Sequence, residues 1–184
     1  LTKEELKMVD EHKKKTYPNI SNTTSNDTHV LENKALNNLK KNLHTKVMDY
    51  FDKVICTDNL ITLHITQSWI NYTKSDQFHH KHNHPNSLVS GIFYISADKK
   101  VDSVKFYKGS PDDRIKLNIT KYNIFNSFSC KFPVETGDVI LFPSTLIHGV
   151  DKKKGTNTRI SLSFNVFIKG KIGNKSSLTE LIIK

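Results

Sequence analysis

The feature that most constrains the fold is a change of hydrophobic period near residue 59. From residue 60 to about 72 apolar and polar residues alternate, which is typical of a β-strand with one buried face. Similar short runs follow at 87–96, 102–107, 115–119, 125–132, 138–142 and 159–168, punctuated by Gly, Pro, Asn and Asp. Many short strands without interleaved helices favour a β-sandwich or barrel.

Two helices are expected before this β-region. Residues 1–15 have helical spacing, and Thr2 is placed as an N-cap ahead of Glu5. Apolar residues at three- and four-residue steps between about 32 and 54 predict a helix that packs on a sheet. Residues 18–28, rich in Asn, Ser and Thr, predict an irregular connector. We expect one domain, with a helical buttress at 1–58, a β core at 59–170 and a tail at 171–184.

Cysteine content, targeting signals and net charge limit the cellular compartment and the binding partners that the sequence favours. Cys56 and Cys130 are too few for a disulfide framework and indicate reduced thiols. Without a targeting signal or an apolar run that could span a membrane, the sequence favours a cytoplasmic protein. The net charge of +10 favours acidic partners, but the lysines show no recognition-helix or stacking pattern, so nucleic acid is a disfavoured partner. A homodimer through the helical face is expected only because homodimers are the commonest oligomers.

The strongest local signal is the run His-His-Lys-His-Asn-His at residues 79–84. In an extended segment, residues two apart project to the same face, so His82 and His84 can present two nitrogens to one metal ion. His80 with His82 has the same spacing and stays open as an alternative register. The segment therefore predicts half of a metal site.

A third ligand and an anion-binding pair follow later in the chain. His148 ends an apolar run and precedes Gly149, so it can complete the metal site. Arg159 and Ser161 open the last long strand, and alternation places both side chains on one face. A guanidinium beside a hydroxyl is suited to binding one carboxylate.

His-x-His early in a β-domain, a late His and then Arg-x-Ser resemble the 2-oxoglutarate- and iron(II)-dependent dioxygenases over about residues 60–170. The wording His-Asn-His-Pro-Asn-Ser, then Ser-Gly-Ile-Phe-Tyr-Ile and Arg-Ile-Ser-Leu-Ser-Phe-Asn, resembles a branch without an assigned function in bacteria and their viruses. The resemblance implies a double-stranded β-helix, or cupin-like jelly roll, with the N-terminal helices on one outer face. It also implies iron(II), 2-oxoglutarate and dioxygen as reactants, release of succinate and carbon dioxide, and hydroxylation of a protein side chain or a small molecule.

Carried over by residue, the resemblance implies two sets of site residues. The iron ligands are His82, His84 and His148, and the residues that hold the 2-oxoglutarate carboxylate are Arg159, Ser161 and Tyr94. Tyr72, on the strand that enters the histidine segment, is a further candidate for lining the co-substrate pocket. The Pro-Asn-Ser continuation after His84 favours the His82 and His84 register.

One position departs from the usual pattern of the superfamily. His84 stands where a carboxylate normally completes two imidazoles around iron(II). A neutral third ligand leaves the site one unit more positive, and three-histidine sites also suit zinc. The alternative is therefore a non-catalytic or zinc-loaded cupin-like metal-binding module, which has no need of the Arg-x-Ser pair. The loops expected to select the substrate, at 98–101 and 110–114, carry no recognisable motif.

Overall fold

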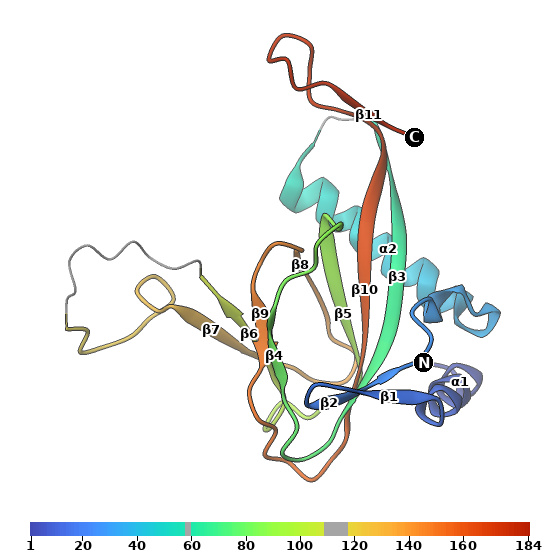
Figure 1. Cartoon of the computed structure of the whole chain (residues 1–184), viewed down its shortest axis with the longest axis vertical. Helices are drawn as coiled ribbons and strands as arrows, with labels where there is room; N and C mark the ends of the chain where they lie inside the picture. Colours follow the sequence, from blue (N-terminus) through green and yellow to red (C-terminus); the bar gives the residue numbers. More distant parts are fainter. Residues whose placement is uncertain (58–59, 109–117) are drawn as a thin grey trace.

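The computed structural model describes residues 1–57, 60–108 and 118–184, and it consists mainly of antiparallel strands (Figure 1). The helical elements are α1 (Lys3–Lys13), the 3-10 turns η1 (Val30–Glu32) and η2 (Lys34–Leu36), α2 (Asn37–Tyr50) and the π-turn η3 (Phe51–Ile55). The strands are β1 (Thr16–Asn19), β2 (Asn22–Ser25), β3 (Ile61–Thr73), β4 (His79–His82), β5 (Val89–Ser96), β6 (Ser103–Tyr107), β7 (Ser129–Pro133), β8 (Val139–Pro143), β9 (His148–Val150), β10 (Arg159–Ile172) and β11 (Leu181–Ile183). Among the described residues, no helix has the length and apolar character needed to cross a membrane.

Both predicted helices are present, and their sequences explain where they begin. Thr2 caps α1 through a capping box, because its side chain accepts from the Glu5 N–H while Glu5 accepts from the Thr2 N–H. In α2 the residues Leu39, Leu43 and Val47 recur at four-residue steps and are buried. The predicted helical pattern between 32 and 54 is therefore confirmed, divided into short turns at both ends.

The strands form two sheets that face each other across the interior (Figure 1). The large sheet has the order β1-β2-β3-β10-β5-β8, with β11 also paired to β10, and the small sheet has the order β4-β9-β6-β7. The neighbours β3 and β10 are antiparallel and paired along most of their lengths. Two facing antiparallel sheets are the jelly-roll arrangement, so the predicted fold class is confirmed.

The two faces of the large sheet have different roles, because side chains alternate along each strand. Leu162, Phe164 and Val166 of β10 point to one face and pack with α1 and α2 in the larger apolar core. The intervening residues Ser163 and Asn165 point to the other face, toward a cavity. The helices thus cover one face of the sheet and leave the other for the site.

Some predicted segments differ in the structure. The connector predicted at 18–28 instead forms most of the hairpin β1–β2, which extends the large sheet beyond β3. The run at 125–132 forms a strand only from Ser129, and the tail at 171–184 includes β11. The strand predicted at 115–119 and the loop at 110–114 fall on or overlap 109–117, which lie outside the described residues.

Candidate metal centre and co-substrate cavity

Three histidines, from two neighbouring strands and the segment that follows one of them, lie close together. His82 ends β4 and is paired with His148 at the start of β9, while His84 follows β4 by two residues. One nitrogen from each ring lies within 4.8 Å of the others. This spacing allows a single ion to contact all three, so the structure brings together the three histidines that the sequence predicted.

The hydrogen bonds of the three rings define their tautomers. Nδ1 of His82 lies 2.8 Å from the His80 carbonyl oxygen, and Nδ1 of His148 lies 3.0 Å from the Leu146 carbonyl oxygen. A carbonyl only accepts, so each Nδ1 must carry the proton and donate it. Nδ1 of His84 lies 2.6 Å from Asn165 Oδ1. All three Nε2 atoms therefore keep a free lone pair, which is the form that binds a metal ion.

His84 is held by a buried network of uncharged side chains. Ser90 Oγ donates to Asn165 Oδ1 at 2.9 Å and lies 3.0 Å from His84 Nδ1. Ser144 connects this pair to Ser87 through hydroxyl contacts of 2.8 Å. Contacts of this kind behind a metal ligand fix the ring orientation. The ring of His84 is consequently positioned by Asn165, by Ser90 of β5, and by Ser87 and Ser144 in the connections before β5 and after β8.

The surroundings of the triad favour neutral imidazoles. Burial lowers the pKa of His82 and His84, and it lowers the pKa of His148 to about 4. Aromatic rings supply part of this burial, with Trp69 beside His84 and Phe142 beside His148. At neutral pH the three histidines are therefore unprotonated and can bind a metal ion without first losing protons.

A buried guanidinium lines the same cavity. Arg159 begins β10 and is 2% exposed. Its Nη1 donates to the Ser103 carbonyl oxygen at 3.4 Å and its Nη2 donates to Thr73 Oγ1 at 3.2 Å, both long contacts with uncharged oxygens. Its Nε has no hydrogen-bond partner among the described residues. A buried guanidinium with few hydrogen-bond partners is suited to binding an anion.

Ser161 and Tyr94 stand beside this guanidinium. They are cross-strand partners in the pair of β10 and β5, and both line the cavity. Burial raises the pKa of Tyr94 to about 12, so its hydroxyl keeps its proton and can donate it to an anion. Arg159, Ser161 and Tyr94 thus form a patch of donors in the cavity that also contains the triad.

Tyr72 does not line the cavity, and that expectation was wrong. Its side chain is buried on the helical face of β3, and its hydroxyl donates to the Val9 carbonyl oxygen of α1 at 2.7 Å. The residues on either side of it, Asn71 and Thr73, point to the opposite face of the strand, and Asn71 lines the cavity. Tyr72 therefore joins helix to sheet.

The two remaining histidines of the segment line the cavity but are not part of the triad. His79 is close to Thr73 Oγ1 at 2.8 Å and to Asn22 Nδ2 at 3.0 Å, and it forms part of the cavity wall. His80 is exposed, and its carbonyl oxygen accepts from His82. Within the described parts of the chain, the group that can hold an ion includes His84 and excludes His80.

The cavity has a volume of about 630 Å³ and is walled mostly by amide, hydroxyl and aromatic groups. Among the described residues that line it, Arg159 is the only one with a permanent charge, and none is acidic. The hairpin β1–β2 forms one wall through Asn22 and Thr24. Sequence reasoning missed this wall and the support from Asn165, although alternation along β10 places Asn165 on the same face as Arg159.

A sequence profile of the family described as "Putative 2OG-Fe(II) oxygenase" matches residues 67–165, which is more than half of the chain. The matched range contains the three histidines, Arg159 and Ser161. A sequence search of curated proteins found no match.

Solved structures with the same fold include several oxygenases. An oxidoreductase of the 2OG-Fe(II) oxygenase family from Burkholderia pseudomallei has a TM-score of 0.60 at 15% identity, over 90% of this chain and 79% of the other. HygX from Streptomyces hygroscopicus, with nickel, 2-oxoglutarate and hygromycin B bound, has a TM-score of 0.60 at 14% identity, over 90% and 78%. A viral collagen prolyl hydroxylase from Paramecium Bursaria Chlorella virus-1, in complex with 2-oxoglutarate, has a TM-score of 0.53 at 13% identity, over 89% and 88%. At these identities the likeness establishes the jelly-roll fold.

Proposed function

Because the chain belongs to the 2OG-Fe(II) oxygenase family, we propose that it hydroxylates a small molecule or a protein side chain, with His82, His84 and His148 as the iron ligands. The family uses iron(II), 2-oxoglutarate and dioxygen, and the bound iron supplies the oxidative chemistry that decarboxylates the co-substrate to succinate. The donor set fits this role, since the three neutral imidazoles of His82, His84 and His148 would hold a divalent iron ion through their nitrogens.

The residues of the chain would perform three tasks around that chemistry. The triad holds the ion through nitrogens whose tautomers are already fixed. Arg159, Ser161 and Tyr94 bind the distal carboxylate of 2-oxoglutarate through charge-assisted hydrogen bonds. Trp69 and Phe142 exclude water from the triad, which strengthens the electrostatic contacts there.

The single observation that carries the proposal is the burial of Arg159 without a carboxylate partner in its hydrogen bonds. A buried guanidinium with only long contacts to uncharged oxygens lines the same cavity as a metal-binding triad. A dicarboxylate with one end at the triad and the other at Arg159 would satisfy both groups. The alternative, a zinc-loaded barrel without catalysis, suits the triad equally well. It does not explain why a charged guanidinium is buried in the same cavity.

The walls of the cavity support a substrate without positive charge. A cation in the cavity needs a carboxylate partner to offset its lost hydration, and the described lining residues include none. Amides such as Asn22 and Gln67 can both donate and accept, and Trp69 offers a flat apolar surface. These groups favour a neutral polar molecule or an uncharged side chain.

Anaerobic titration of the metal-free protein with iron(II) and then 2-oxoglutarate tests metal and co-substrate together. We expect a visible charge-transfer absorption that needs both components and appears at one equivalent of each. Zinc(II), with a filled d shell, should give no such band and serves as the control. Absence of the band with iron(II) and 2-oxoglutarate would favour the metal-binding module.

A further inference from the structure

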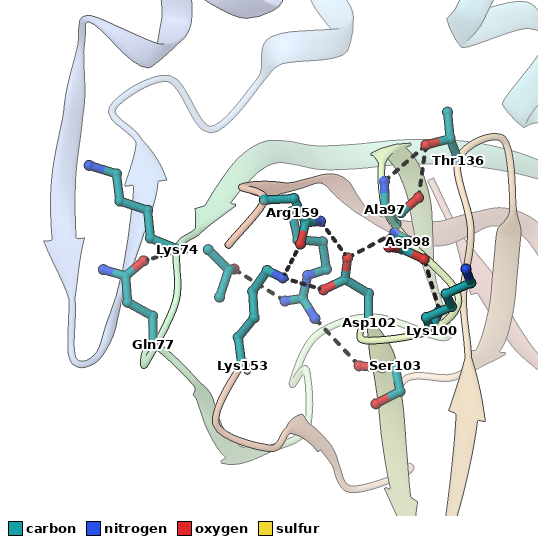
Figure 2. A network of polar contacts seen from close by, with 12 residues as sticks. Lys74, Gln77, Ala97, Asp98, Lys100, Asp102, Ser103, Thr136, Lys153 and Arg159 are labelled. Carbon is teal, nitrogen blue, oxygen red and sulfur yellow. Dashed lines mark hydrogen bonds and ion pairs between the residues drawn. The ribbon is translucent and has the colours of Figure 1, made fainter. Parts of the chain in front are cut away.

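A buried ion pair lies next to the arginine of the cavity (Figure 2). Asp102, just before β6, and Lys153, in the connection from β9 to β10, have side chains that are each 1% exposed. Lys153 Nζ lies 3.1 Å from Asp102 Oδ1. Ser103, the residue after Asp102, accepts a hydrogen bond from Arg159. The pair therefore borders the guanidinium, although Asp102 and Lys153 are not part of the cavity wall.

The two oxygens of Asp102 are held in different ways. Oδ2 accepts from the Asp98 backbone N–H at 2.9 Å and from Asn157 Nδ2 at 3.0 Å. Oδ1 accepts no hydrogen bond from the described residues, so the charge of Lys153 is what stabilises it. Lys153 is itself fixed by donating to Asn157 Oδ1 at 2.7 Å. One carboxylate oxygen thus depends on Lys153 alone.

Two atoms of this buried cluster have no hydrogen-bond partner among the described residues. They are Asp102 Oδ1, which is held by the charge of Lys153 alone, and Arg159 Nε. Burial lowers the pKa of Arg159, while the nearby Tyr94 and the carboxylate of Asp102 act in the opposite direction. Without a competing cation, a buried carboxylate and a buried guanidinium would be expected to pair.

The charges of the cluster add to one positive unit, from two cations and one anion. Lys153 neutralises Asp102, and the charge of Arg159 is left uncompensated. A buried charge of this kind is costly until a counter-ion arrives. The distal carboxylate of 2-oxoglutarate would bring the total to zero.

We propose that Lys153 is a positioning residue for 2-oxoglutarate: by pairing with Asp102, it keeps this carboxylate from neutralising Arg159. The inference rests on the proposed function, because it requires that Arg159 bind the co-substrate. Lys153 acts through Asp102 and touches neither the co-substrate nor the ion. Lys153 lies in the segment that joins His148 of the triad to Arg159. This connection between the metal-binding residue and the carboxylate-binding residue therefore also controls the charge around Arg159.

The test is 2-oxoglutarate affinity by calorimetry on iron(II)-loaded protein without oxygen. Lys153→Met should weaken 2-oxoglutarate by about tenfold or more, because Asp102 then pairs with Arg159. Asp102→Asn should bind it as tightly as the wild type or more tightly, since both cations remain. The double variant Lys153→Met with Asp102→Asn again leaves Arg159 uncompensated, and its affinity should return to within about threefold of the wild type.

Two controls separate positioning from structural damage. Lys152→Met alters the neighbouring lysine, which is 66% exposed and paired with the exposed Asp76, and it should leave 2-oxoglutarate affinity unchanged. The iron content of every variant should also be unchanged. A purely structural role for the ion pair predicts that both single variants lose affinity and that the double variant recovers none.

Unchanged affinity in Lys153→Met, or a loss without rescue in the double variant, would overturn the inference. If Lys153→Met does not fold, Asp102→Asn decides alone, because weaker 2-oxoglutarate binding in that variant contradicts the charge argument. A wild-type protein that binds iron but no 2-oxoglutarate would overturn the proposed function as well. A wild type that binds normally beside unaffected variants would overturn only the role of Lys153.

Discussion

His82 and His148 are cross-strand partners in the antiparallel pair of β4 and β9, and their ring centroids lie 4.4 Å apart. The sequence separates them widely, but the small sheet makes them neighbours. An ion bound between them would link two short strands that pair at His79 with Val150 and at His82 with His148. Metal binding and the order of this sheet are therefore coupled.

Loss of one triad residue should abolish stoichiometric metal binding. His82→Ala or His148→Ala leaves two of three ligands, which hold the ion too weakly to survive purification. His80→Ala is the matched control, because His80 is not part of the triad and its hydrogen bond to His82 comes from the backbone carbonyl, which remains. Metal content by atomic absorption measures the outcome. Retention of the metal by His148→Ala, or its loss from His80→Ala, would show that another ligand set is used.

Asn165 should matter for metal affinity although it does not contact the ion. Asn165→Ala removes the acceptor that holds the proton on His84 Nδ1, so the ring is free to rotate or to change tautomer. We expect metal affinity to fall by about 10- to 100-fold. Ser163 lies two residues earlier on the same face, and its hydroxyl accepts from Asn71 and does not contact the triad. Ser163→Ala is therefore the control and should keep the wild-type metal affinity in a competition titration.

Acidification should destabilise the metal-free protein. Burial lowers the pKa of His148 to about 4, whereas the ordinary value is 6.5. Between these values the unfolded chain binds a proton that the folded chain excludes, so the free energy of unfolding falls as the pH falls. Thermal unfolding of the metal-free protein from pH 7 to pH 4 should show a steeper loss of Tm for the wild type than for His148→Asn. Parallel curves would disprove this assignment.

The packing of the core leaves no room for a side chain at position 91. This residue lies on β5 opposite Phe164 of β10, and an added Cβ would collide with the phenyl ring. Gly91→Ala should therefore lower the free energy of unfolding by about 1–3 kcal/mol, because Phe164 is fully buried and has no free space to enter. Urea denaturation measures this change. Combining it with Phe164→Leu should cost less than the two separate losses added together.

The strands that the sequence predicted and those that it missed differ in what their side chains face. β3, β5 and β10 place alternate residues in the apolar core beneath the helices, and this produces a clear period of two. β1 and β2 direct residues such as Asn22 and Thr24 into a polar cavity. Their sequence therefore resembles that of a loop, and it is the pairing of β1 with β2 and of β2 with β3 that makes them strands.

The site was predictable where ligands follow strand alternation. That rule placed His82 with His84 and Arg159 with Ser161, and the resemblance added Tyr94. The same rule excludes Tyr72, which is out of phase with Asn71. Partners such as Asn165 with His84, or Asp102 with Lys153, come from distant elements. No spacing in the sequence encodes such contacts, because packing of the sheets creates them.

The most direct test of the central claim is the affinity of Arg159→Leu for 2-oxoglutarate, measured by calorimetry on iron(II)-loaded protein without oxygen. A charge-assisted bidentate contact is worth roughly 1.5–3 kcal/mol, so the affinity should fall by about tenfold to a few hundredfold while iron binding persists. Arg159→Lys should recover part of the loss, and Ser161→Ala should cost less. Equal affinity in the wild type and in Arg159→Leu would contradict the account and leave a metal-binding barrel without a co-substrate site.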